Sequence, residues 1–178
     1  MDFTNTTLSF ESDRIIVRTM EQGDATERYA NWINDPEVNR YLGTKSTTIP
    51  ELLEYIEHWN QDPQALFFGI FLKDNTHVGT VKLEPINIQN HTAMIAIMIG
   101  DKKAWGKGYG SEAMQLLINW CFEELDLEEV TLGVVSTHMP AIRAYEKLGF
   151  VGYETELQCL HYGDEIHDRL YMAIKRPV

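Results

Sequence analysis

Hydrophobic patterning along the chain predicts strands and helices in a mixed order. Runs of apolar and β-branched residues predict strands at 14–20, 66–72, 77–83, 92–99, 130–135, 151–160 and 168–174. The polar turn at 73–76 between two of these runs favours a hairpin. Thr92–Ile99 is nearly all apolar, which is typical of a strand that is covered on both faces.

A helical period predicts helices at 24–34, 48–59, 109–124 and 140–148. The second begins with a capping-box pattern at Thr48–Glu51, and Gly149 follows the last helix at a typical C-cap position. The order of elements predicts a mixed α/β domain with a mostly antiparallel front half. A helix between two buried strands in the back half predicts a local parallel crossover.

Composition places the chain among ordinary globular proteins. The 178 residues are 44% hydrophobic and 24% charged, with no repeat or linker, so we expect one domain over 1–178. The first residues show no signal-peptide pattern, and no apolar run is long enough for a membrane helix. Cys121 and Cys159 are interpreted as buried free thiols in a reducing, cytoplasmic setting, although a disulfide between them stays open.

The formal net charge of −12 argues against general nucleic-acid binding, because an acidic surface repels phosphate backbones. Two interpretations of this charge stay open. It either serves solubility alone or attracts a cationic acceptor.

A glycine-rich loop carries the clearest candidate chemistry. Gly106, Gly108 and Gly110 alternate after a buried strand and open a long predicted helix. Glycine accepts a positive φ and lets a ligand approach the backbone. The free N–H groups of a helix's first turn attract anions, so the loop is suited to a pyrophosphate. The alternative is an ordinary turn.

Other phosphate-binding motifs match this loop poorly. A P-loop needs four residues between its first glycine and the Gly-Lys pair, but five residues separate Gly100 from Gly106. Gly108 also stands where a magnesium-binding Ser or Thr is required. A dinucleotide fingerprint would need glycine where Ser111 stands.

Two motifs within Ile97–Phe150 resemble those of the GNAT N-acetyltransferase superfamily. The first, Trp105–Gly110, is similar to the family's Arg/Gln-x-x-Gly-x-Gly/Ala acyl-CoA motif. Trp105 replaces the usual Arg or Gln, as it often does in the branch that acetylates the N-terminal alanine of ribosomal proteins. The second is Ala141-x-x-x-Tyr145-x-x-x-Gly149-Phe150. The front half also fits, through 13–18 and 32–38.

The resemblance implies a GNAT-like fold with splayed central strands and helices on both faces. It also implies that acetyl-CoA binds through backbone groups. The pyrophosphate would contact the backbone amides of the glycine-rich loop, which belong to Gly106, Lys107, Gly108, Tyr109, Gly110 and Ser111. The pantetheine arm would lie along the preceding strand, with Met98 and Ile99 as its backbone partners.

The resemblance also suggests catalytic residues. Tyr145 matches the residue that protonates the departing thiolate in many relatives, although an aromatic residue on a short helix is more often core. His138 stands where the family usually has Asn, so it is a cofactor-binding donor, a base or an exposed loop residue. Glu84 is the candidate general base, with a solvated strand-end carboxylate or a water chain as the alternatives.

The expected function is an acetyl-CoA-dependent transfer of an acetyl group to a primary amine, by direct attack in a ternary complex. A backbone amide of the 92–99 strand would stabilise the oxyanion. The acceptor would be a small-molecule amine, such as a polyamine or amino sugar, or a peptide N-terminus. Tyr162, Asp164 and Asp168 are possible acceptor contacts.

We expect no metal, no nucleic-acid partner and no membrane association, and either a monomer or a homodimer. The alternatives are a non-catalytic acyl-CoA sensor or regulatory module and a nucleotide-binding protein that uses the same loop.

Overall fold

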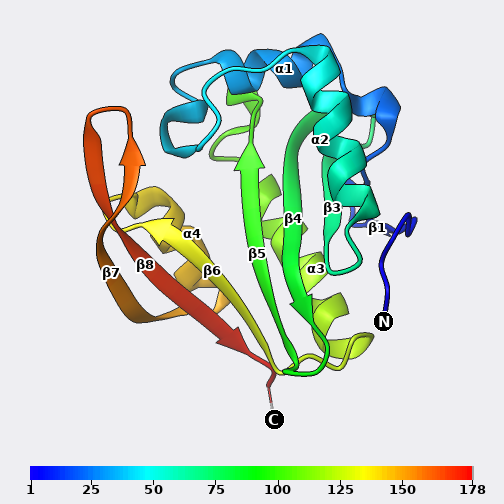
Figure 1. Ribbon diagram of the computed structural model, residues 1–178. Helices are drawn as coiled ribbons and strands as arrows, with labels where there is room; N and C mark the ends of the chain where they lie inside the picture. The colour runs from blue at the N-terminus through cyan, green and yellow to red at the C-terminus, as the bar shows by residue number, and fades with distance from the viewer. Residues whose placement is uncertain (178) are drawn as a thin grey trace.

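An eight-stranded mixed sheet organises the protein (Figure 1). The computed structural model describes residues 1–177. The strands are β1 (Ser9–Glu11), β2 (Ile15–Thr19), β3 (Leu66–Leu72), β4 (His77–Asn87), β5 (Thr92–Ile99), β6 (Glu129–Val135), β7 (Val151–Tyr162) and β8 (Glu165–Lys175). Their order across the sheet is β1-β2-β3-β4-β5-β6-β8-β7. All neighbours are antiparallel except β5 and β6, which confirms the predicted mixed sheet and its parallel crossover.

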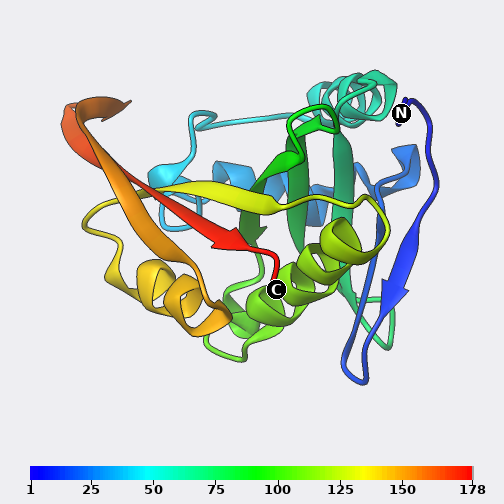
Figure 2. The same ribbon diagram turned by 90° about the horizontal axis from the view of Figure 1, so that it is seen from below.

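Helices cover both faces of the sheet. They are α1 (Glu27–Asn34), α2 (Ile49–Gln61), α3 (Tyr109–Glu123) and α4 (Met139–Leu148), with 3₁₀ turns η1 (Gln22–Asp24), η2 (Asn39–Tyr41) and η3 (Lys102–Ala104). Figure 2 shows α3 and α4 together on one side of the sheet, with α2 on the other. The larger core lies under α3 and includes Leu83, Ile95 and Leu117, all fully buried. A smaller core, with Tyr29 and Ile56, joins α1 and α2 to β3.

Differences from the predicted elements have local causes. The helix expected at 24–34 begins only at Glu27, because Asp24 closes the preceding turn by accepting a 2.8 Å hydrogen bond from the Glu21 N–H. Thr26 then caps α1 through its side chain. Strand β4 runs past the expected end at Leu83, since a register shift between Leu83 and Ile86 lets it continue beside β5. The three-residue strand β1 was not predicted.

The pairing of β5 with β6 ends early. Only Thr92, Ala93 and Met94 pair with β6, opposite Glu129, Val130 and Thr131. Beyond this point β5 remains paired with β4 and β6 with β8. The two strands therefore lie side by side at their start and diverge toward the top of Figure 1. The predicted splay is confirmed, and it leaves one edge of β5 without a strand partner.

Both cysteines are free thiols. Cys121 is buried, and burial raises its pKa to about 12. Cys159 is only half-buried, so the expectation of two buried thiols is wrong for this residue. Within residues 1–177, no helix has both the length and the apolarity required to cross a bilayer.

A buried histidine at the start of β4 links the fold to pH. His77 is 7% exposed, and its ring stacks on Phe71 with centroids 4.6 Å apart. Its Nε2 lies 2.9 Å from the Gly79 carbonyl oxygen, whereas its Nδ1 is buried without a partner in the described chain. Burial lowers the pKa of His77 to about 4, and Arg18 and Arg28 act in the same direction against Asp24.

We expect acid to destabilise the protein through His77. The unfolded chain binds a proton near pH 6.5 and the folded chain only near pH 4, so the unfolding free energy falls as the pH falls through this window. The shift corresponds to about 3 kcal/mol. Urea unfolding at a series of pH values between 7 and 4 measures this fall in the unfolding free energy. The stability difference between wild type and His77→Gln should shrink by about that amount toward pH 4. The exposed-site control His161→Gln should show no such change, and parallel pH profiles for wild type and His77→Gln would contradict the prediction.

Candidate active site

The first turn of α3 presents a row of free backbone donors. Gly106 and Gly108 have positive φ angles of 71° and 83°, and no side chain caps the helix. In the chain from 1 to 177, no group accepts a hydrogen bond from the backbone N–H of any residue from Gly106 to Ser111. These donors lie at the positive end of the helix dipole. The local arrangement therefore has the chemistry of an anion site.

The glycine-rich loop is braced by the turn that precedes β2. Arg14 Nη1 donates to the Lys107 carbonyl oxygen at 2.9 Å, and Arg14 Nε donates to Glu112 Oε2 at 2.7 Å. Ser12 also donates to the Glu112 carboxylate. Partial burial acts to raise the pKa of Glu112, but the hydrogen bonds from Ser12 and Arg14 lower it below its usual range. Arg14 thus holds the loop and neutralises the acid in the first turn of α3.

Trp105 connects this loop to β5. Its indole Nε1–H donates to the Ile99 carbonyl oxygen at 2.7 Å, although 40% of the residue is exposed. Of the two backbone partners predicted for a pantetheine arm, Ile99 therefore already uses its carbonyl within the chain. Met98 lies one residue earlier, on the part of β5 that has separated from β6. The acyl-CoA motif in the sequence singled out Trp105, but it gave no indication of the hydrogen bond to Ile99.

A cavity of about 440 Å³ lies on the face of the sheet that α1 and α2 cover. Met98 and Ala96 of β5 form part of its wall. On the opposite face, a methyl group added at Gly110 would lie 3.3 Å from Ile97 Cδ1 and 3.4 Å from Ile99 Cγ1. The unpaired part of β5 therefore separates the cavity from the start of α3.

The segment that connects α1 to α2 closes one side of the cavity. The buried Asn39 donates from Nδ2 to the carbonyl oxygens of Ile33 at 2.7 Å and Lys45 at 2.9 Å. Lys102, at the start of η3, forms ion pairs with Asp35 at 2.7 Å and Glu37 at 3.1 Å. These contacts hold the segment in place and tie it to the glycine-rich loop.

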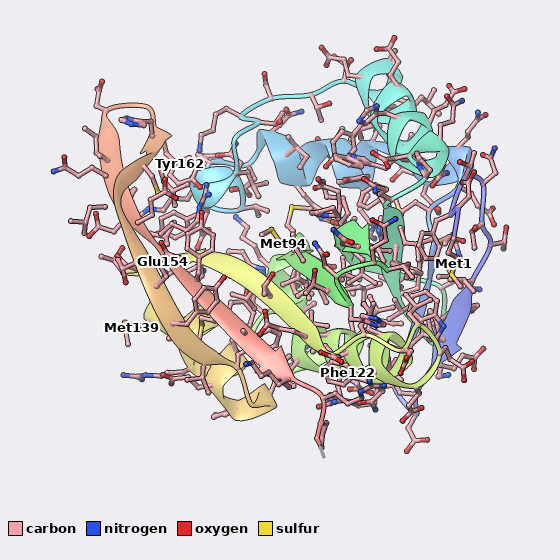
Figure 3. The ribbon with its side chains drawn as sticks, turned by 60° about the horizontal axis from the view of Figure 1, so that its bottom comes forward. Met1, Met94, Phe122, Met139, Glu154 and Tyr162 are labelled. Carbon is pink, nitrogen blue, oxygen red and sulfur yellow. The ribbon has the colours of Figure 1, made fainter. Side chains whose placement is uncertain are left out.

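An aromatic cluster joins this segment to the β7–β8 hairpin. The ring of Tyr41 lies 4.9 Å from His138, 6.2 Å from Tyr162 and 5.8 Å from His167, measured between centroids. Figure 3 labels Tyr162 where the hairpin approaches the η2 segment. The structure therefore brings Tyr162 and His138 together. The Asp168 carboxylate is engaged within the hairpin, since it accepts a 2.8 Å hydrogen bond from Gln158 N–H, and Asp164 is exposed in the hairpin turn.

Tyr145 and His138 both belong to α4, one within the helix and the other at its N-cap. The Tyr145 ring packs edge-on against Phe150, and burial raises its pKa to about 12. Its hydroxyl forms no hydrogen bond to any residue from 1 to 177. Burial, together with the charge of Arg40, lowers the pKa of His138 below its usual value. Near neutral pH, His138 is therefore an uncharged imidazole and Tyr145 a protonated phenol.

Glu84 is not among the residues that line the cavity. Its carboxylate lies 3.3 Å from the Lys82 ammonium, which in turn lies 3.3 Å from the centroid of the Trp59 ring. The carboxylate that does line the cavity belongs to Glu51. In the sequence, Glu51 was interpreted only as part of a capping box, a role that the structure confirms. Among residues 1–177, no group of three or more His, Cys, Asp or Glu side chains is arranged to hold a metal ion.

Comparison with known proteins places this architecture in a family. The family profile described as "Acetyltransferase (GNAT) domain" matches residues 14–151. The chain is 31% identical over 144 residues to the uncharacterized N-acetyltransferase p20 of Bacillus licheniformis, a match that covers 78% of this chain and 80% of that protein. The fold and these matches define an acyltransferase. The chain belongs to the GNAT acetyltransferase family.

Solved structures share the whole fold. A probable acetyltransferase superposes with a TM-score of 0.85 at 24% identity, over 95% of this chain and 97% of that one. The spermidine N-acetyltransferase of Vibrio cholerae, in complex with CoA and spermine, has a TM-score of 0.83 at 22% identity, over 92% of this chain and 96% of that one. At these identities the similarity establishes the fold.

The environment of His138 predicts its titration. We expect the His138 imidazole to titrate below pH 6.5, because burial and Arg40 both disfavour its charged form. NMR titration of the histidine side chains measures this pKa. Arg40→Gln should raise the pKa of His138, since it removes the nearby cation, whereas Arg143→Gln on the exposed surface of α4 should not. A pKa of His138 at or above 6.5 in the wild type would contradict the prediction.

Proposed function

We propose that the protein transfers an acetyl group from acetyl-CoA to a primary amine by direct attack within a ternary complex. The observation that carries this proposal is the uninterrupted row of free N–H groups from Gly106 to Ser111, directly beside the unpaired edge of β5. Main-chain donors at a helix N-terminus suit a diphosphate. The strand edge offers hydrogen-bonding groups to an extended pantetheine arm, in the manner of an added strand.

The two substrates would approach from opposite faces of the sheet. The thioester would pass between β5 and β6 from the side of α3, and the amine would wait in the cavity beside Ala96 and Met98. Such an arrangement holds the two reactants together without a covalent acyl-enzyme. Cys121 supports this route, because its thiol is buried and its pKa is raised to about 12, which makes it a poor nucleophile.

The proposed bond changes involve the unpaired edge of β5 and Tyr145 of α4. The amine nitrogen bonds to the thioester carbon, and a backbone N–H of β5 donates to the oxygen that becomes negative. The carbon–sulfur bond breaks, and the Tyr145 hydroxyl donates its proton to the departing sulfur. Because burial raises the pKa of Tyr145 to about 12, its hydroxyl is protonated near neutral pH and is available as a donor to the departing sulfur. The amine gives its own proton to water in the cavity, which then restores the Tyr145 hydroxyl.

His138 would assist by position. It stands at the N-cap of α4, the helix that carries Tyr145, where its backbone carbonyl accepts hydrogen bonds from the N–H groups of Ala141 and Ile142. Its uncharged imidazole ring packs against Tyr41. We assign no base role to Glu84, because its carboxylate is paired with Lys82 and the residue is not part of the cavity lining.

The acceptor class is a separate question. The likeness to the branch that acetylates ribosomal-protein N-terminal alanines depends on Trp105. In the structure this side chain bonds to the Ile99 carbonyl, so it supports the cofactor loop and lies outside the cavity lining. Trp105 therefore carries no information about the amine. Two free thiols support the expected reducing, cytoplasmic setting.

Replacement of Tyr145 by Phe tests the proposal. We expect Tyr145→Phe to lower kcat by about 100-fold, because the variant lacks the proton donor but keeps the ring that packs on Phe150. CoA affinity, measured by calorimetry, should stay within about two-fold, since the proposed cofactor contacts are main-chain groups. Release of free CoA in the presence of an amine panel provides the rate.

The control is Tyr153→Phe, which changes a tyrosine on β7 that is 57% exposed and should leave kcat unchanged. Full activity in Tyr145→Phe would remove this residue from the mechanism. CoA binding without turnover in the wild type, across the whole amine panel, would favour a non-catalytic acyl-CoA sensor.

A further inference from the structure

We propose that the acceptor is a small monoamine in which one primary amine is joined by a short chain to an aromatic or branched apolar group, and that polyamines are poor acceptors. This inference rests on the proposed function, because it takes the cavity beside β5 as the place of the amine. The evidence is the size, the lining and the charge balance of that cavity.

The cavity suits a small, largely apolar molecule. Its volume of about 440 Å³ is typical of small-molecule sites. Much of the wall is apolar or aromatic, from α1, α2, the connecting segment and the sheet: Ile33, Leu42, Leu52, Tyr55, Phe67 and Met98. An aromatic or branched group would be removed from water against these side chains, which is favourable.

Only one carboxylate is present to receive an ammonium group. Glu51 is the sole acidic residue among those that line the cavity. Its Oε2 accepts hydrogen bonds from the Thr48 N–H at 2.7 Å and the Thr48 hydroxyl at 2.9 Å. Its Oε1 has no hydrogen-bond partner in the described chain. The cavity can therefore compensate one positive charge, through a carboxylate whose position the capping box fixes.

The two phenols of the cavity wall add no negative charge. Burial raises the pKa of both Tyr29 and Tyr55, and the nearby Glu84 adds to the shift at Tyr55. Both rings are therefore neutral at physiological pH. Hydroxyl groups of the connecting segment, such as Thr44 and Ser46, complete the polar part of the lining without a charge.

The other charged residue of the cavity lining is a lysine, which offers no negative charge to a second ammonium group. Lys82 lines the cavity from β4, opposite the helix α2 that carries Glu51. Its ammonium is held over the Trp59 ring and beside the Glu84 carboxylate, so it is fixed in position. Glu84 neutralises Lys82, so Glu51 is left as the uncompensated charge of the lining. A polyamine would bring two or more positive charges to a cavity that can compensate one of them, and the remaining charge would be costly to desolvate.

The acidic surface does not change this conclusion. The net charge of −12 belongs to the whole chain and raises the local concentration of any cation near the protein. Selection among bound amines depends on the groups inside the cavity. The Vibrio cholerae spermidine N-acetyltransferase shares the fold at 22% identity, which leaves the chemistry of the two cavities independent.

A direct test compares acceptors with the full-length protein. Release of CoA from acetyl-CoA is measured with 2-phenylethylamine, spermidine and a short peptide that begins with phenylalanine, and the acetylated products are identified by mass. We expect kcat/KM for 2-phenylethylamine to exceed that for spermidine by at least about ten-fold. Equal or better use of spermidine, or clearly better use of the peptide, overturns the inference. Both of those outcomes leave the proposed function intact.

Two variants test the charge argument. Glu51→Gln keeps the capping box, since Gln also accepts from Thr48, and should raise KM for 2-phenylethylamine about ten-fold with little change in kcat. Glu54→Gln, an exposed neighbour on α2 outside the lining, is the matched control. Lys82→Glu should shift the ratio of kcat/KM values toward spermidine by about ten-fold. An unchanged ratio in Lys82→Glu with unchanged KM in Glu51→Gln contradicts the inference.

Calorimetry with CoA distinguishes a failure of the acceptor inference alone from a failure of the proposed function. If CoA binds and 2-phenylethylamine is not acetylated while another amine is, the acceptor class is wrong and the transferase assignment stands. If CoA does not bind, the proposed function itself fails. In either case the acceptor inference is rejected.

Discussion

The parting of β5 from β6 is the constraint on which the site depends. A sheet strand normally satisfies its backbone groups on both edges, but β5 loses its partner on one edge after three residues. Its other edge stays paired with β4 from Thr92 to Ile99. The open edge is therefore a permanent feature of the fold. It provides a place where an extended ligand can complete the sheet.

The loop at the start of α3 complements that edge. Positive φ angles at Gly106 and Gly108 turn the chain so that consecutive N–H groups remain free. Arg14 fixes the loop from one side through Lys107, and Trp105 fixes it from the other through Ile99. The donors are thus held in position before any ligand arrives, which reduces the entropy lost on binding.

The fold and the loop could be predicted from the sequence because their signals are local. Apolar periodicity marks strands and helices, and alternate glycines mark a backbone that must stay open. The site around them could not be predicted in the same way. The contact between Arg14 and Glu112 joins residues far apart in the chain, and the presence of Glu51 in the cavity lining depends on the packing of α2. The sequence could not show that Glu84 would be engaged by Lys82 either, since their pairing depends on the side-chain packing around Trp59.

The most direct measurement is hydrogen–deuterium exchange of the backbone amides with and without CoA. If the free donors from Gly106 to Ser111 receive the diphosphate, saturating CoA should slow exchange at these amides by at least about ten-fold. The edge of β5 around Met98 should also gain protection. If calorimetry detects bound CoA and these amides exchange at an unchanged rate, the ligand lies elsewhere and the account of the site is wrong.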